Sequence, residues 1–116
     1  FKGKVAVVVG AGSGIGAAIS RQLAIEQAEV VVADINGDAA SQVAAEIRSH
    51  GGQAHNFAVD VTDAQALETF VESVVDKCGG LHLAVNNRLS DFEPAAVERE
   101  IRFIVKAAAA GMRKER

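Results

Sequence analysis

The sequence has no tyrosine, no tryptophan, one proline and one cysteine, and no long hydrophobic run. The single cysteine, Cys78, excludes an internal disulfide, which is typical of a reducing compartment, so we expect a cytoplasmic protein. No stretch approaches the roughly 20 apolar residues of a membrane span. The first apolar run is short and ends in glycines, unlike a secretory signal. We therefore expect no membrane association.

Charge and histidine placement argue against two further ligand classes. The net charge is −3, whereas nucleic-acid-binding domains are usually basic, so no nucleic-acid partner is expected. The three histidines, at 50, 55 and 82, fall in separate elements without ligand spacing, and no metal site is expected. Cys78 is expected to be a half-buried structural thiol rather than a nucleophile. With 116 residues, 49% of them hydrophobic, the sequence predicts a single domain over 1–116.

A glycine-rich turn is the most informative feature that the sequence does contain. Residues 5–9 read Val-Ala-Val-Val-Val, typical of a buried strand, and residues 10–16 read Gly-Ala-Gly-Ser-Gly-Ile-Gly. Ile15, Ile19 and Leu23 then recur at helical spacing. Glycines let the main chain approach a pyrophosphate, and the free N–H groups of the next helix point toward it. The pattern predicts dinucleotide binding; the alternative is a turn whose glycines serve only tight packing.

An acidic residue at the end of the next predicted strand supports the dinucleotide interpretation. Residues 30–33 read Val-Val-Val-Ala, and Asp34 follows them, 18 residues after Gly16. A carboxylate at this position can accept both ribose hydroxyls of an adenosine, and it repels a 2′-phosphate. We therefore expect NAD rather than NADP as the cofactor.

Strand and helix patterns alternate along the chain. Strands are predicted at residues 4–9, 29–34, 53–59 and 81–86. Helices are predicted at 14–27, from the turn at 36–38 to about 50, from a cap at Thr62 or Asp63 to the glycines at 79 and 80, and after a capping box at Ser90. Successive βα units predict an α/β fold, a Rossmann-type doubly wound parallel sheet with strand order 3-2-1-4. Ligands are expected at the carboxyl ends of strands one and four.

Three motifs resemble those of the short-chain dehydrogenases/reductases. Residues 9–16 resemble the family's Thr-Gly-x-x-x-Gly-x-Gly loop, and residues 60–63 (Asp-Val-Thr-Asp) its segment after strand three. Residues 85–87 (Val-Asn-Asn) resemble the start of its Asn-Asn-Ala-Gly motif. The motifs occur in the family's order, and the resemblance covers residues 4–87, the family's N-terminal cofactor-binding half.

The resemblance implies which residues bind the cofactor. The phosphates and the near ribose would contact Gly10, Ser13, Gly14, Ile15 and Gly16. Asp34 would hold the adenosine ribose, Asp60 and Val61 the adenine, and Asn86 the region near the ribose. The alternatives are that Asp60 is a turn or capping acid and that Asn86 merely ends a strand.

The chain also departs from the family's pattern. Val9 replaces the usual threonine, and Arg88 and Leu89 replace Ala-Gly. No asparagine follows Asn87 and no tyrosine occurs, so the family's catalytic asparagine and Tyr-x-x-x-Lys are not among these residues. We expect a domain truncated before strand five, with no catalytic residue and no activity on its own.

Two functions stay open. The family transfers hydride between nicotinamide and a carbonyl or alcohol carbon, with a tyrosine as proton donor. The first function is an NAD(P)-dependent oxidoreductase of which this chain is the cofactor-binding half, with a small carbonyl or alcohol substrate only when its second half is present. The alternative is a noncatalytic NAD-binding or assembly module. Phe92, Phe103 and the apolar stripe of the last predicted helix favour a homo-oligomer.

Overall fold

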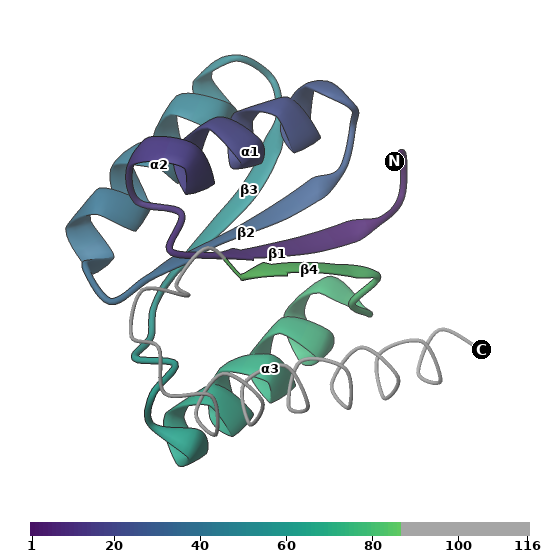
Figure 1. The fold of residues 1–116 in the computed structure, drawn as a ribbon. Helices are drawn as coiled ribbons and strands as arrows, with labels where there is room; N and C mark the ends of the chain where they lie inside the picture. Colours follow the sequence, from purple (N-terminus) through teal and green to yellow (C-terminus); the bar gives the residue numbers. More distant parts are fainter. Residues whose placement is uncertain (87–116) are drawn as a thin grey trace.

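The computed structural model describes residues 1–86, which alternate between strands and helices (Figure 1). In chain order the elements are β1 (Val5–Val9), α1 (Gly14–Ile25), β2 (Glu29–Asp34), α2 (Gly37–Ser49), β3 (Gln53–Ala58), α3 (Ala64–Cys78) and β4 (Leu83–Asn86). The strands pair in parallel in the order β3-β2-β1-β4. The predicted α/β class and strand order are therefore confirmed. The helix predicted after Ser90 lies outside the described residues, with Phe92 and Phe103.

The central strands β1 and β2 are buried on both faces, which explains their continuous apolar runs, whereas the edge strand β3 is mostly exposed or half-buried. All five residues of β1 are buried, and they alternate between two cores. Val5, Val7 and Val9 pack with Val31 toward α3, whereas Ala6 and Val8 pack toward α1 and α2. Figure 1 shows α1 and α2 together on one side of the sheet and α3 on the other.

Several predicted boundaries shift by one or two residues for identifiable reasons. The first helix ends at Ile25 rather than at 27 because Gln27 adopts a φ of 70° and turns the chain toward β2. Asp63, not Thr62, caps α3, and its Oδ1 accepts from the amides of Gln65 and Ala66 at 3.0 and 3.1 Å. Gly79, with a φ of 82°, ends that helix as predicted.

The start of β4 is the clearest such correction. The ladder begins at Leu83 rather than at 81, and the preceding residues attach to β1 in another way. The His82 amide donates to the Val5 carbonyl, and His82 Nδ1 accepts from the Val5 amide, both at 2.9 Å. A side chain therefore replaces one main-chain partner at the edge of the ladder.

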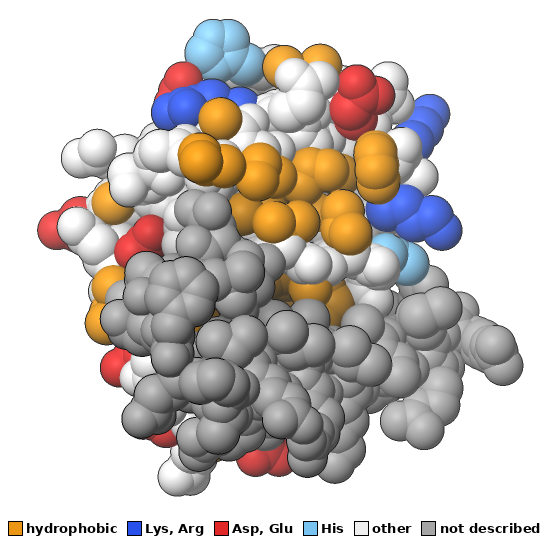
Figure 2. All heavy atoms as spheres, in the orientation of Figure 1, with side chains coloured by type: hydrophobic (Ala, Val, Ile, Leu, Met, Phe, Trp, Pro, Cys, Tyr) orange, Lys and Arg blue, Asp and Glu red, His pale blue; other side chains and the backbone are white. Residues whose placement is uncertain are grey.

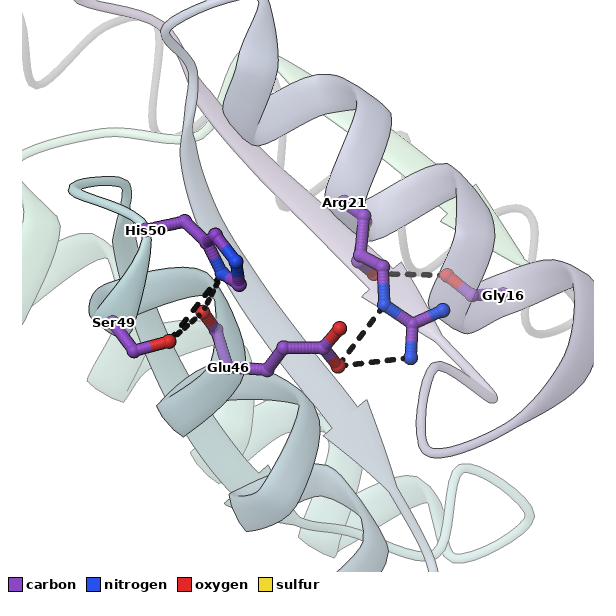
Figure 3. Close-up of polar contacts among 6 residues, drawn as sticks. Gly16, Arg21, Glu46, Ser49 and His50 are labelled. Atoms are coloured by element: carbon purple, nitrogen blue, oxygen red, sulfur yellow. Dashed lines mark hydrogen bonds and ion pairs between the residues drawn. The ribbon is translucent and has the colours of Figure 1, made fainter.

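The two helices that share a face are joined by one exposed ion pair. The Arg21 guanidinium of α1 donates through Nε and Nη2 to Glu46 Oε2 of α2, at 3.1 and 3.0 Å (Figure 3). Figure 3 also shows Ser49 and His50 turned toward the Glu46 main chain, where the Ser49 hydroxyl donates to the Glu46 carbonyl at 2.7 Å. Exposed pairs of this kind contribute at most about 1 kcal/mol, so the alternating cores hold the helices in place.

Hydrophobic side chains gather across the middle of one face of the molecule, on the side of α1, with charged side chains around them (Figure 2). Consistent with this, Ile19, Leu83 and Val85 are only partly buried where they pack on the core beneath α1 and α2. No helix within residues 1–86 is long and apolar enough to cross a membrane.

Candidate functional site

The glycine-rich turn joins β1 to α1 at the carboxyl edge of the sheet and is tied to the end of β2. The Ala11 amide donates to the Ala33 carbonyl at 3.0 Å, and the Gly12 amide donates to Asp34 Oδ2 at 2.9 Å. Gly10 and Gly14 adopt φ values of 75° and 58°, a region that favours glycine. The turn thus contacts the predicted acid through Gly12, a glycine that lies between the predicted site glycines Gly10 and Gly14.

Two glycines of the turn are required by packing within the protein. A Cβ on Gly16 would lie 2.2 Å from the Gly10 carbonyl oxygen, so the start of α1 can approach β1 only without a side chain there. A Cβ on Gly12 would lie 2.8 Å from the Ala39 Cβ and 3.0 Å from Asp34 Oδ2. Gly14 differs, because a Cβ there would meet nothing within 4 Å. Close packing therefore accounts for Gly12 and Gly16 and leaves open space at Gly14.

The three described helices begin in different ways. Asn36 caps α2 by accepting from the Ala39 amide at 3.1 Å, with Asp38 in its first turn, and Asp63 caps α3. Ser13 stands at the corresponding position of α1, but its side chain makes no capping hydrogen bond and the first turn holds no acidic residue. The amides that open a helix carry partial positive charge and attract anions. Of these three helices, only α1 begins without a hydrogen bond from its first amides to a side chain of residues 1–86.

Asp34 is held by main-chain amides at both carboxylate oxygens. Oδ2 accepts from Gly12 as described, and Oδ1 accepts from the Asn36 amide at 2.9 Å. The Asp34 carbonyl accepts from the Val59 amide at 3.0 Å, which links the end of β2 to the segment after β3. Each carboxylate oxygen has two lone pairs, so the carboxylate can still accept two hydroxyl donors in a fixed orientation.

The remaining predicted site residues, Asp60, Val61 and Asn86, lie at the same edge of the sheet. Asp60 Oδ1 accepts from the Thr62 amide at 3.0 Å and from the Thr62 hydroxyl at 2.6 Å, so Asp60 does stabilise a turn. Val61 as a whole is 4% exposed and belongs to the core on the α3 side. Asn86 ends β4 and pairs with Val9, directly before the glycine turn.

The sequence interpretation did not assign a contact to Gly12, although its amide orients the acid. The sequence contained only part of the signal for this contact, namely a glycine within the turn and an acid at the end of the next strand. Their hydrogen bond joins positions 22 residues apart, and only the parallel pairing of β1 with β2 brings them together.

A second polar cluster lies at the opposite end of the sheet. Glu29 opens β2, His55 lies on β3 and Cys78 ends α3, and Glu29 Oε2 lies 2.6 Å from His55 Nε2. The pKa of the Cys78 thiol is raised to about 12, chiefly by burial and then by the neighbouring Glu29 carboxylate, against a smaller lowering by Lys77. The thiol is thus half-buried and protonated at neutral pH, as expected of a structural cysteine.

The fold and the glycine turn together define a Rossmann-type α/β domain. The chain matches the family model described as short chain dehydrogenase over residues 4–112, and it therefore belongs to the short-chain dehydrogenase family. It is 44% identical over 85 residues to the 7alpha-hydroxysteroid dehydrogenase of Escherichia coli (strain K12). These 85 residues are 73% of this chain and 33% of that enzyme.

Solved structures of the family have the same fold. A metagenomic short-chain oxidoreductase in complex with NADP superposes with a TM-score of 0.84 at 32% identity, over 97% of this chain and 57% of that one. A 7 alpha-hydroxysteroid dehydrogenase complexed with NADH and 7-oxo glycochenodeoxycholic acid superposes with a TM-score of 0.82 at 34% identity. That match covers 97% of this chain and 49% of the dehydrogenase. The chain thus spans between a third and somewhat more than half of the length of these relatives.

Proposed function

We propose that this chain is the cofactor-binding half of an NAD(P)-dependent oxidoreductase that acts on a small carbonyl or alcohol substrate. Family membership supports this proposal, as do two similar structures that bind NADP and NADH. The observation that carries it is the start of α1, where no side chain of the described residues caps the helix and the turn before it is built from glycine. Such a helix start is a ready-made anion site.

The residues present fit a dinucleotide. The diphosphate and near ribose would lie against Gly10, Ser13, Gly14, Ile15 and Gly16. Asp34 would hold the adenosine ribose, Asp60 and Val61 the adenine, and Asn86 the region near the ribose. Space at Gly14 and the fixed Asp34 carboxylate support this assignment. When bound, the nicotinamide group supplies or accepts the hydride. The described residues bind and orient the cofactor.

NAD is the proposed cofactor rather than NADP because of Asp34. Two amides hold this carboxylate with lone pairs left for the two ribose hydroxyls. A 2′-phosphate at the same place would meet a negative charge, and within residues 1–86 no basic side chain binds either Asp34 oxygen. The similar structures bind either cofactor, so the preference depends on this chain's own acid.

Calorimetric titration with NADH and NADPH tests both parts of this proposal. We expect saturable NADH binding by the wild type. Asp34→Ala should weaken NADH about tenfold or more, because hydrogen bonds to a charged group contribute about 1.5–3 kcal/mol each. NADPH binding should stay unchanged or improve, because the repelling charge is removed.

Glu26→Gln is the matched control for that titration. It also removes one exposed negative charge, but at the C-cap of α1, at the far end of the helix from the glycine turn. Its affinities for both nucleotides should equal those of the wild type. The absence of saturable heat with either nucleotide would rule out cofactor binding. If the ratio of the NADH and NADPH affinities in Asp34→Ala equals that of the wild type, the assigned role of Asp34 is ruled out.

We further propose that the chain binds cofactor without turning over substrate on its own, since its 116 residues contain no tyrosine to donate the proton. NADH oxidation with a carbonyl substrate by this chain alone would contradict that proposal. We also propose a cytoplasmic, self-associating protein with residues 1–116 in one domain. Light scattering that gives a monomer at high concentration would contradict self-association.

A further inference from the structure

Three different metal-ligating side chains meet at the end of the sheet opposite the glycine turn. They come from three elements: Glu29 from β2, His55 from β3 and Cys78 from α3. One potential ligand atom from each lies within 4.8 Å of the other two. The Glu29 and His55 side chains are each 26% exposed, so the cluster is sheltered but open to small ions.

The spacing of these atoms is close to that of a metal's first coordination sphere. Zinc binds thiolate at about 2.3 Å and imidazole or carboxylate at about 2.0–2.2 Å, so tetrahedral ligand atoms lie roughly 3.3–3.7 Å apart. The sulfur, nitrogen and oxygen of the cluster lie within 4.8 Å of one another, so an ion would have to draw the more distant atoms about 1 Å closer. The 2.6 Å contact between Glu29 and His55 would open by about 1 Å as the ion takes the place of their hydrogen bond.

The mixed donor set selects the kind of ion. One sulfur, one nitrogen and one oxygen suit a borderline cation such as Zn²⁺, whereas Mg²⁺ and Ca²⁺ require oxygen ligands. A thiolate and a carboxylate neutralise the charge of a divalent ion, which lowers the cost of placing it in a half-buried site. The nearby Lys77 ammonium lies over the Phe57 ring, 5.7 Å from its centroid, where it is held by a cation–π contact.

We propose that Glu29, His55 and Cys78 form a Zn²⁺ site with water in the fourth position. The ion would join β2, β3 and α3 at one point and stabilise the docking of α3 on the sheet. Cys78 would bind as the thiolate and release its proton to solvent. The competing interpretation is a hydrogen-bonded Glu29–His55 pair with Cys78 beside it as packing.

Cobalt titration distinguishes the two interpretations, because only a thiolate ligand gives an intense thiolate-to-cobalt charge-transfer absorption. The tag-free protein, cleared of metal with EDTA, should bind one equivalent of Co²⁺ with this absorption, and Zn²⁺ should displace it. Cys78→Ser should abolish the absorption. His55→Asn and Glu29→Gln should weaken binding at least about tenfold, since even outer-shell changes cost 10–100-fold. His50→Gln, which changes a histidine at the end of α2, should leave the titration unchanged.

Three results would overturn the proposal. They are a wild-type titration without charge transfer, an absorption that persists unchanged in His55→Asn and Glu29→Gln, and an equal loss of affinity in His50→Gln. If the His55 or Glu29 variant does not fold, thermal unfolding decides instead. Zn²⁺ should then raise the melting temperature of the wild type and not that of Cys78→Ser, and an equal rise in both overturns the proposal.

Discussion

At the scale of single residues, glycines with the same chemistry have different tasks in one turn. Gly16 is required because a Cβ would lie 2.2 Å from the Gly10 carbonyl oxygen, whereas Gly14 has open space around it. The family resemblance implied that both line the phosphates and near ribose of the cofactor, but spacing along the chain does not show which glycine is also required by packing. That distinction depends on how closely α1 approaches β1, which is a property of the fold.

The pKa of the Cys78 thiol offers a direct test of how strongly burial acts on a single side chain. Its pKa is raised from 9.0 to about 12, chiefly by burial and then by Glu29. The thiol of the unfolded chain ionises near 9 while that of the folded protein stays protonated. This group therefore contributes its full stability below pH 9, and the contribution is lost as the pH rises from 9 toward 12.

Ultraviolet thiolate absorbance of the metal-free protein measures this difference. At about pH 10 we expect almost no thiolate in the folded protein and mostly thiolate in urea. Cys78 is the only cysteine, and the absence of tyrosine removes the phenolate signal that would otherwise overlap in this pH range. A thiolate signal that rises near pH 9 in both states would show that the thiol is not desolvated.

At the scale of elements, the sequence predicted every described strand and helix and their order. Hydrophobic period, glycines and caps are local signals, and they agree with the long-range packing in this molecule. What could not be predicted joins distant positions, such as the Gly12–Asp34 bond across 22 residues and the Glu29–His55 contact across 26. The histidine spacing that argued against a metal site concerns the sequence alone, whereas the parallel register of β2 and β3 places Glu29 beside His55, the contact on which the proposed zinc site is built.

The helix caps provide a matched pair for a prediction at this scale. Asp63 accepts from two amides of α3, and Ser13 at the same position of α1 accepts from none through its side chain. Asp63→Ala should therefore lower the free energy of unfolding by about 1 kcal/mol, and Ser13→Ala by less than about 0.5 kcal/mol. Urea unfolding measures both values.

Nucleotide binding should reverse that ranking. Ser13→Ala should weaken NADH binding, because the Ser13 hydroxyl is proposed to contact the cofactor. Asp63→Ala should leave the affinity for NADH close to that of the wild type. Equal stability losses in the two variants would mean that Ser13 caps α1 after all, and the start of that helix would then be less suited to an anion.

At the scale of the whole molecule, the two proposed sites occupy opposite ends of β2. Glu29 is its first residue and Asp34 its last, which separates them by about 17 Å at 3.3–3.4 Å per residue. The residues between them are buried on both faces and share no side chain with either site. Because a close-packed interior resists rearrangement, we expect the binding of one ligand to leave the other site unchanged.

NADH and Zn²⁺ should therefore stabilise the protein independently. Each ligand raises the free energy of unfolding by an amount set by its concentration relative to its Kd, about 2.7 kcal/mol at a hundredfold excess. Urea unfolding with both ligands should give the sum of the two separate increases within about 0.5 kcal/mol, as for distant sites without shared partners. A combined increase that departs from the sum by more than about 1 kcal/mol would mean that strain passes along β2, because a packed strand joins Asp34 to Glu29 directly.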